Sequence, residues 1–541
     1  MNISSRPKYP PISDYGYISD CHSSALISRA GSIDWCCMPR IDSASCFGRL
    51  LDWENGGYCK IFPAEDCQVS RRYIERTLVL ETTFLSEKGE ARMLDFFPMQ
   101  KGGEHKPLQQ ILRILEGVHG EMEVSLECAP LFDYGAIRPW IRQKGDHFLA
   151  IGGQTGLLLS GFDCLRLEGR HKICGTCQVK KGDRHRFSIL YGRPENLEEG
   201  LVIPPSSEEM DSRLDQTINW WRRWADQGTF SGFESDMVIR SAIVLKGLSN
   251  APTGAIAAAA TTSLPEAPGG SRNWDYRFSW VRDSSFTVRS LAELGYTREA
   301  DGFRRFIERS CAGNADELQI LFGVGGERRL HEYEVRELEG YRGAHPVRIG
   351  NAAESQLQLD VYGELLDLAW SWHHRGQCPD DDYWEFLIEL VEAATKQWRR
   401  ADQGIWEMRG KPRHFVFSKA MCCVAIEQGM RLARELKRDV PLNDWRKICV
   451  EIRAAIEEKG YDAERGVFIQ AFDCPVMDAS LLLLPLYGFI DGRDERMVRT
   501  VEAIRCDLDE DGLLRRYRAD GMDGEEGVFL PCSFWLAECL A

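Results

Sequence analysis

An apolar stripe at helical spacing runs through residues 381–399, DDYWEFLIELVEAATKQWR. Its members fall at positions i, i+3, i+4, i+7 and i+11, and acidic residues lie elsewhere in the stretch. This period of about 3.6 residues places the apolar side chains on one side, so the stretch predicts a helix with one buried face. The residues of the stripe are Trp384, Leu387, Ile388, Val391 and Thr395.

The same period continues from Phe233 to the end of the chain, where strand signals nearly vanish, so we expect an all-α domain there. Long loops rich in Gly and aromatic residues separate pairs of helices, and their composition argues against disorder. This pattern favours a helical toroid with a central pocket. An α-solenoid is the alternative, but no fixed sequence repeat supports it. Ten helical segments are predicted, at 234–248, 283–294, 297–311, 352–374, 381–399, 415–437, 442–458, 478–489, 493–506 and 531–541.

From Ile12 to Gly192 the chain follows a different pattern, in which short apolar runs alternate with polar residues. A period of two predicts an antiparallel β domain, and the runs 25–28 and 32–35 around Gly31 predict a hairpin. After Pro204-Pro205, Ser206 and the glutamates that follow it predict the capped start of a helix. We therefore expect a β-sandwich domain over 1–204, a helical linker over 205–232 and a helical catalytic-type domain over 233–541.

Composition excludes several classes of protein. The 541 residues contain 67 Lys and Arg against 83 Asp and Glu, and a net charge of −16 opposes binding to nucleic acid or to an anionic membrane. The longest apolar run, 481–490, is too short to cross a bilayer and contains Pro485. Residues 1–10 lack the apolar core of a secretory signal, and the 19 scattered cysteines suit a reducing compartment. We expect a cytoplasmic protein.

Motifs for metals and phosphates are weak. The CxxC at 174–177 has no second pair, and we interpret it as a turn in a β-rich region. The 11 histidines form no HExxH pattern, and the glycines at 323–326 lack the Lys-Ser/Thr of a P-loop. We expect no metal and no cofactor.

The densest group of unusual residues is SRNWDYRFSWVRD, residues 271–283, which combines five charges with four aromatic rings before a helix start. Aromatic rings stack on the apolar faces of sugar rings, and Arg and Asp hydrogen-bond vicinal hydroxyls. A structural ion-pair network is the alternative interpretation.

Two further clusters lie in loops. In GIWEMRG, residues 404–410, Glu407 follows Trp406, and an apolar ring beside a carboxyl raises its pKa, so Glu407 is a candidate general acid. RRYR at 515–518 is followed by GEEGVF at 524–529, which brings cations and carboxylates together before an apolar helix. A solvated charged turn explains this last cluster equally well in isolation.

Taken in order, these motifs resemble glycoside hydrolase family 15, the inverting exo-α-glucosidases that include glucoamylases, glucodextranases and bacterial and archaeal trehalases. The likeness runs from Ile12 to the last residue. The matching segments are ISDYG at 12–16, GSIDW at 31–35, PR at 39–40, TGA at 253–255, TSLPE at 262–266, RNWDYR at 272–277, GNAA at 350–353, QLD at 358–360, GIWE at 404–407 and FLPCSFW at 529–535.

The resemblance implies a β-supersandwich, a linker and an (α/α)6 barrel whose pocket accepts one terminal glucose. It implies that Trp280 stacks on the sugar while Arg282 and Asp283 grip its hydroxyls. Glu407, beside Trp406, matches the catalytic acid of the family. Two further positions of the same subsite match Arg516 and Tyr517.

One departure from the family concerns the general base. An (α/α)6 barrel has twelve helices, but ten are predicted before Ala541, so we expect the last hairpin to be missing and the open apolar faces to favour a homo-oligomer. The family base is a Glu before the final helix, in a Glu-Glu-x-Asp pattern that these residues do not contain. Glu525 or Glu526 is the candidate substitute, which makes Glu407 and Glu526 the predicted catalytic residues.

Three hypotheses of function follow. The first is a glucoamylase-like or trehalase-like hydrolase that releases glucose from non-reducing ends of oligosaccharides or disaccharides. The second is a catalytically impaired relative that acts as a sugar-binding or regulatory protein. The third is an α-glucoside phosphorylase. The linkage is left open, because selectivity for the leaving group depends on the shape of outer loops.

Overall fold

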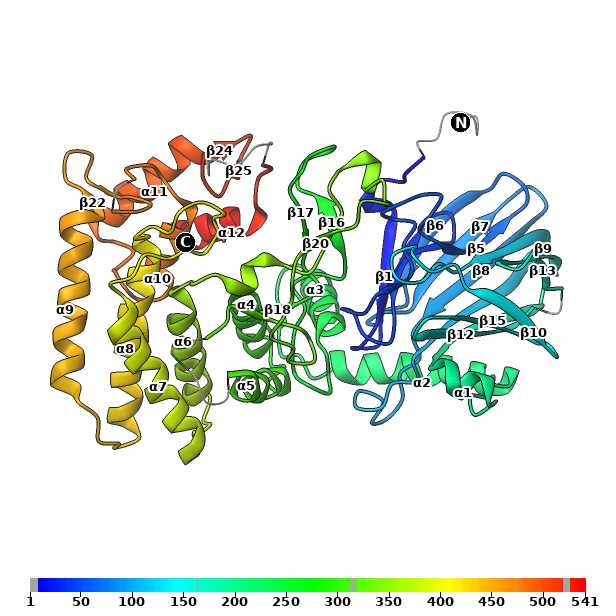
Figure 1. Ribbon diagram of the computed structural model, residues 1–541, viewed down its shortest axis with the longest axis horizontal. Helices are drawn as coiled ribbons and strands as arrows, with labels where there is room; N and C mark the ends of the chain where they lie inside the picture. The colour runs from blue at the N-terminus through cyan, green and yellow to red at the C-terminus, as the bar shows by residue number, and fades with distance from the viewer. Residues whose placement is uncertain (1–7, 163, 312–314, 316–317, 473, 519–525) are drawn as a thin grey trace.

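The computed structural model describes residues 8–162, 164–311, 315, 318–472, 474–518 and 526–541. A β-sheet domain and a helical domain lie side by side, and the long helix α2 (Ser207–Ala225) runs along the edge that joins them (Figure 1). Strands β1 to β15 lie between Tyr15 and Gly192, and helices α3 to α12 lie between Ser235 and Leu540. The change from a β domain to a helical domain is confirmed, while the exact domain boundaries stay predictions.

The β domain has two layers that share strand β9 (Gln110–Ala129). The first half of β9 pairs with β8 (Gly89–Phe96) and β15 (Arg184–Gly192), and the second half pairs with β5 (Tyr58–Pro63) and β14 (Lys172–Lys180), all antiparallel. Apolar residues of both layers meet in one core. The other strands are β1 (Tyr15–Ser19), β2 (Ser24–Ser28), β3 (Ser32–Cys37), β4 (Ser45–Phe47), β6 (Gln68–Tyr73), β7 (Leu80–Leu85), β10 (Trp140–Lys144), β11 (His147–Gly152), β12 (Thr155–Gly161) and β13 (Arg166–Glu168), and the short helix α1 spans Pro194–Glu198.

Local predictions in this half have mixed outcomes. The hairpin is confirmed, since β2 and β3 pair in antiparallel register around Gly31. The linker helix is confirmed as well, and Ser206 and Glu209 form its capping box. The turn at 174–177 is wrong: Cys174 and Cys177 lie inside β14, where residues three apart point to opposite faces of the sheet.

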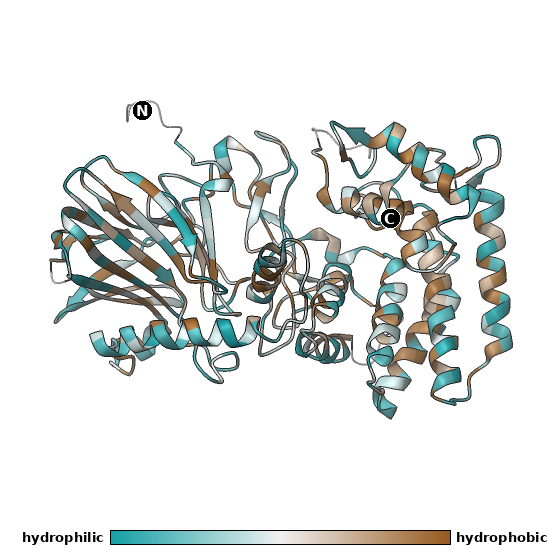
Figure 2. Cartoon of the chain, turned by 180° about the vertical axis from the view of Figure 1, so that it is seen from behind, coloured by the Kyte–Doolittle hydropathy of each residue, from teal (hydrophilic) through white to brown (hydrophobic). Residues whose placement is uncertain are grey.

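The helical domain is built around a row of inner helices. Contacts connect α4 (Val281–Glu293) to α6 (Asp360–His374), α6 to α8 (Val416–Glu435), and α8 to α10 (Leu483–Leu486), which in turn contacts α12 (Leu530–Leu540). The remaining helices are α3 (Ser235–Leu248), α5 (Arg298–Cys311), α7 (Asp381–Gln397), α9 (Leu442–Lys459) and α11 (Glu495–Leu508). In Figure 2 the hydrophobic residues gather on the strands of the β domain and on α12 beside the C-terminus.

Two of the ten predicted helices differ from the structure. The prediction of one helix over 352–374 is wrong, because a 3-10 turn (Ala352–Ser355) is followed by extended chain before α6 begins. The helix predicted over 478–489 is a 3-10 turn (Ala479–Leu482) followed by the single turn of α10, and Gly488, with φ of +70°, closes it. Short strand pairs also lie in the loops, at β16 (Thr262–Pro265) with β17 (Asn273–Asp275), β18 (Ser279–Trp280) with β19 (Leu321–Phe322), β20 (Tyr333–Glu334) with β21 (Arg348–Ile349), β22 (Tyr461–Asp462) with β23 (Val467–Phe468), and β24 (Asp509–Glu510) with β25 (Leu513–Leu514).

Arg277, which forms a buried ion pair with Asp275, also connects the helical domain to the β domain through hydrogen bonds. Two nitrogens of Arg277 lie 2.7 and 2.8 Å from the oxygens of Asp275, and both side chains are fully buried. Arg277 also donates to the carbonyl of Ser43 at 2.7 Å and to the hydroxyl of Tyr134 at 2.8 Å, both in the β domain. This part of 271–283 is therefore the structural ion-pair network that the sequence left as an alternative.

We expect Asp275→Ala to lower the free energy of unfolding by about 3–5 kcal/mol, because it leaves the Arg277 charge buried and uncompensated. Denaturant unfolding of the purified chain measures this. The control is Arg399→Ala, which removes a half-exposed pair with Glu451 and is expected to cost less than about 1 kcal/mol. Equal effects of the two substitutions would contradict the prediction.

Across the described residues, every helix is too short or too polar to cross a membrane.

Candidate active site

A cavity of about 720 Å³ opens among the loops of the helical domain. It brings together six of the eight predicted site residues, and it places Glu407 and Arg282 in the same cavity. The six are Arg282, Asp283, Trp406, Glu407, Arg516 and Tyr517.

The start of helix α4 positions the first two of these residues. Trp280, the residue before α4, pairs with Leu321 in a two-stranded piece that fixes where the helix begins. Arg282 and Asp283 then project from the first turn, and the Arg282 Nη2 atom lies 3.3 Å from the Asp283 carboxylate. The side chain of Asp283 is 42% exposed, so it is free to meet a ligand in the cavity.

Glu407 lies on the loop between α7 and α8, in a strained backbone. Its φ of +58° is in the left-handed region, which costs a residue with a side chain about 1–2 kcal/mol. Hydrogen bonds hold this conformation: the Glu407 amide donates to the carbonyl of Gly404 at 3.1 Å, and Gln356 donates to the Glu407 carbonyl at 3.2 Å. Strain maintained in this way is common at functional sites.

Arg282 is the main polar partner of Glu407. Its Nη2 atom lies 3.0 Å from Glu407 Oε1, and its Nη1 atom donates to the carbonyl of Ile405 at 2.6 Å. Burial raises the pKa of the Glu407 carboxyl above its ordinary value, and the nearby Asp283 adds to this rise, while Arg282 opposes it. The raised pKa that the sequence predicted for Glu407 is thus supported, although its causes are burial and the neighbouring Asp283, whereas the sequence pointed to the Trp406 ring.

The loop after α11 supplies the opposite wall. Arg516 lies 2.9 Å from the carboxylate of Glu266 and also pairs with Glu526. The Trp406 ring lies 5.9 Å from the Arg516 guanidinium and 6.3 Å from the Tyr517 ring, and its indole N–H donates to Asp478 at 2.8 Å. Trp406, Arg516 and Tyr517 thus form an aromatic and cationic part of the cavity lining.

Two predicted residues lie outside the lining of the cavity. Trp280 is 2% exposed and packs behind the cavity against Tyr276 and Phe278, so its place suits support of Glu407 better than contact with a sugar. Glu526 has a side chain that is 9% exposed, and its two oxygens meet Arg272, at 3.0 Å, and Arg516. Glu525 lies outside the described residues.

Several lining residues were not singled out from the sequence. The carboxylate of Glu266 and the rings of Trp274, Tyr276, Phe529 and Trp535 all face the cavity. Each lies in a segment that carries the family resemblance, so the motif matches contained a signal, but nothing in them says which side chains point inward.

Buried carboxyls lie beneath the cavity. Desolvation raises the pKa of Asp360 to about 7, with Arg282 opposing the rise, and raises the pKa of Glu364 to about 8. Both oxygens of Glu364 accept a hydrogen bond from the Tyr487 hydroxyl, at 2.7 and 2.8 Å. The folded chain therefore holds protons on these carboxyls to a higher pH than the unfolded chain does.

We expect the stability of the wild-type chain to fall as the pH rises from about 4.5 to about 8. In this window the folded state binds more protons than the unfolded state, so raising the pH favours unfolding. Glu364→Gln should remove the share of this dependence that comes from Glu364, at about 1.36 kcal/mol for each unit of pKa shift that is lost, while the share of Asp360 remains. Thermal melting at both ends of the window measures it. Glu389→Gln, on the solvent side of α7, is the control and should melt as the wild type does at both ends. An unchanged pH dependence in Glu364→Gln would contradict the prediction.

One group of side chains away from the cavity has the spacing of metal ligands within the described residues. Cys423 and Cys449 lie near Glu427, with donor atoms within 4.8 Å of one another. Arg453 already pairs with Glu427 at 2.9 Å, and a hydrogen bond between the two thiols together with burial raises the pKa of the Cys423 thiol, so the group is poorly suited to a cation.

Comparison with known proteins identifies the family. The family model described as "Glycosyl hydrolases family 15" matches residues 232–541, and the model described as "Trehalase-like, N-terminal" matches residues 6–163. The trehalase of Mycolicibacterium smegmatis is 38% identical over 570 residues, covering 99% of this chain and 83% of that protein. The chain belongs to glycosyl hydrolases family 15.

Further known proteins are similar along nearly the whole chain. The trehalase of Thermoplasma volcanium is 33% identical and covers 98% of this chain and 85% of its own length. Among solved structures, a bacterial glucoamylase complexed with acarbose superposes with a TM-score of 0.67 at 11% identity, covering 93% of this chain and 80% of that chain. This similarity confirms the fold of the family 15 chain, a β-sheet domain followed by an (α/α)6-type helical domain.

Proposed function

We propose that this family 15 chain is an exo-acting, inverting α-glucoside hydrolase that releases glucose from a non-reducing end. The observation that supports this best is the 3.0 Å contact between Glu407 and Arg282 in a cavity lined by aromatic rings. A cavity of about 720 Å³ has room for a disaccharide-sized ligand.

In the proposed reaction Glu407 is the general acid. Its proton passes to the glycosidic oxygen as the bond from this oxygen to the anomeric carbon breaks, and the leaving sugar departs with a new hydroxyl. Water attacks the anomeric carbon from the opposite face, and a second carboxylate takes the proton of that water. Arg282, Asp283 and Arg516 hold the hydroxyls of the terminal glucose during this step.

The second carboxylate has two described candidates on the Arg516 side of the cavity. Glu526 is the residue predicted from the sequence, but both its oxygens already meet guanidinium groups, which favours a role in holding Arg272 and Arg516. Glu266 lines the cavity and has one oxygen paired with Arg516. Substitution of the general base should lower kcat strongly. Substitution of a residue that only holds Arg272 or Arg516 in place should mainly raise KM.

Glu266→Gln and Glu526→Gln, compared side by side, separate these roles. If Glu526 is the base, Glu526→Gln lowers kcat about 10²-fold or more and added azide, a small external nucleophile, restores turnover. If it holds the arginines, KM rises and azide has no effect. The same readouts apply to Glu266→Gln.

We propose trehalose as the substrate, on the strength of the trehalases that are 30–38% identical over nearly the whole chain. Inverting hydrolysis of this α,α-linked disaccharide yields one molecule of β-glucose and one of α-glucose. Proton NMR of the first products tests both points, with maltose and isomaltose as comparison substrates.

Release of α- and β-glucose in equal amounts from trehalose is the expected result. Two molecules of α-glucose would disprove inversion, and preference for maltose or isomaltose would disprove trehalose as the substrate. Phosphate-dependent formation of glucose 1-phosphate would favour a phosphorylase. Saturable binding without turnover would favour a sugar-binding or regulatory protein.

A cytoplasmic location and self-association stay predictions. Two apolar side chains of α12 outside the cavity lining, Leu530 and Leu540, are 54% and 57% exposed and support self-association. Light scattering of the wild type and of the double variant Leu530→Ser/Leu540→Ser tests this.

A further inference from the structure

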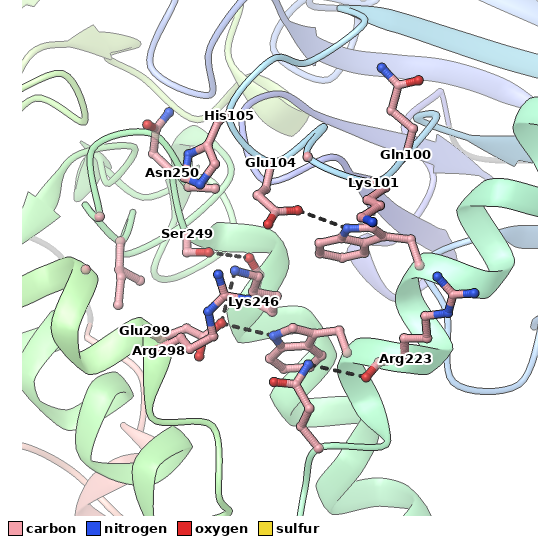
Figure 3. Close-up of a pocket in the computed structure, with 18 of the residues that line it drawn as sticks. Gln100, Lys101, Glu104, His105, Arg223, Lys246, Ser249, Asn250, Arg298 and Glu299 are labelled. Atoms are coloured by element: carbon pink, nitrogen blue, oxygen red, sulfur yellow. Dashed lines mark hydrogen bonds and ion pairs between the residues drawn. The ribbon is translucent and has the colours of Figure 1, made fainter.

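A second, larger cavity of about 1060 Å³ lies where the two domains and the linker meet. It is enclosed by the loop 100–105 of the β domain, the end of α2, the end of α3 with the loop after it, and the start of α5 (Figure 3). Junctions between domains are common places for small-molecule sites. The proposed hydrolysis uses none of these residues except Ile256, which lines both cavities.

The cavity is locally cationic in a chain whose net charge is −16. Its two carboxylates are already engaged. Glu299 lies 3.0 Å from buried Lys246 and accepts the Trp224 indole N–H at 3.0 Å, and Glu104 accepts the Trp220 indole N–H at 3.0 Å.

Four further cations line the cavity. In the described part of the chain, no ion pair connects the side chains of Lys101, Arg223, Arg298 and Arg305 to a carboxylate. Arg298 is also the first residue of α5, a 14-residue helix, so the positive end of the helix dipole adds to the field. A small anion with more than one charge would balance this group.

The ligand must also contain a larger group besides the phosphate, because a phosphate alone fills little of this volume. The Trp220 and Trp224 rings line the cavity, and Trp224 is fixed by stacking on Tyr296 at a centroid distance of 4.2 Å. Polar side chains including Gln100 and Asn219 surround the remaining space. Aromatic rings with polar neighbours suit a hydroxylated ring with one apolar face.

We propose that this cavity binds a phosphate monoester of a sugar. Arg298 and Arg305, which lie seven residues apart and therefore on one face of α5, would hold the phosphate, while the sugar ring would lie against Trp220. Helix α3 borders both cavities, with Lys246 facing this one and Leu245 and Leu248 facing the Glu407 cavity, so an occupant contacts a helix that also forms a wall of the catalytic site.

Isothermal titration calorimetry of the full chain in phosphate-free buffer tests the proposal. The titrants are glucose 6-phosphate, inorganic phosphate and glucose. We expect glucose 6-phosphate to bind at one site, more tightly than inorganic phosphate, with an affinity that falls as salt is added. The double variant Arg298→Glu/Arg305→Glu should weaken this binding at least tenfold.

Matched variants keep the result interpretable. Arg446→Glu makes the same kind of charge reversal on exposed α9, far from α2 in Figure 1, and should leave binding unchanged. Glu407→Gln should also leave it unchanged, which separates this cavity from the catalytic one. If thermal melting shows that the double variant is unfolded, Lys101→Glu, in a loop, replaces it and should also weaken binding. Absence of binding, binding that survives the reversals, or equal affinity for inorganic phosphate would overturn the proposal.

Discussion

Glucose release is expected to fall about 10³-fold in Glu407→Gln, with a much smaller change in KM. The amide keeps the shape of the side chain but has no proton to give to the glycosidic oxygen, and positioned proton transfer contributes about 10²–10⁴ in rate. Initial rates of glucose formation from trehalose measure the effect. Burial raises the pKa of Glu407, so wild-type kcat should fall on the alkaline side at a pH above the ordinary carboxyl range, as the acid loses its proton.

Glu435→Gln is the control for this experiment. Glu435 lies at the end of α8, pairs with His373 at 3.2 Å and is distant from the cavity lining, so its loss should leave kcat unchanged. Wild-type turnover in Glu407→Gln would remove Glu407 from the reaction and with it the proposed mechanism.

The second large effect is expected in Arg282→Ala, which should lower kcat/KM by about 10²–10³-fold. The substitution removes the cation beside Glu407 and Asp283 and the hydrogen bond that anchors the carbonyl of Ile405, on the same loop as Glu407. Truncating one partner of a buried charge pair typically costs about 2–5 kcal/mol, because the other charge is left uncompensated. The alkaline limb of the kcat profile should also move to higher pH, since Arg282 holds the pKa of Glu407 down.

Arg282→Lys separates charge from geometry in this prediction. Lysine keeps the positive charge but cannot contact Glu407 and the Ile405 carbonyl together through one planar group. We expect it to keep the position of the alkaline limb and to lose part of kcat/KM. A shifted limb in Arg282→Lys, or wild-type kcat/KM in Arg282→Ala, would contradict the assigned role.

A helix whose apolar stripe packs along most of its length could be predicted from the sequence. Residues 381–399 are an example, since α7 buries Trp384, Leu387 and Val391. The failed helix at 352–374 shows the limit of this signal. There the Leu357 amide donates to Gln403 and the Leu359 amide donates to Asp402, so hydrogen bonds from a distant loop replace those of a helix. No local pattern reports such partners.

The residue types and their order along the chain were enough to identify the family and the change from strands to helices. They were also enough to place Glu407, Arg282 and Asp283 in one site. These properties depend on periodicity and on motifs within short segments. Tertiary structure alone decided which neighbours face the cavity: Tyr276 and Glu266 line it, while Trp280 lies behind it and Glu526 is held by Arg272 and Arg516. The direction of a side chain depends on packing between segments far apart in the chain, such as the 250 positions between Glu266 and Arg516, and that packing exists only after folding.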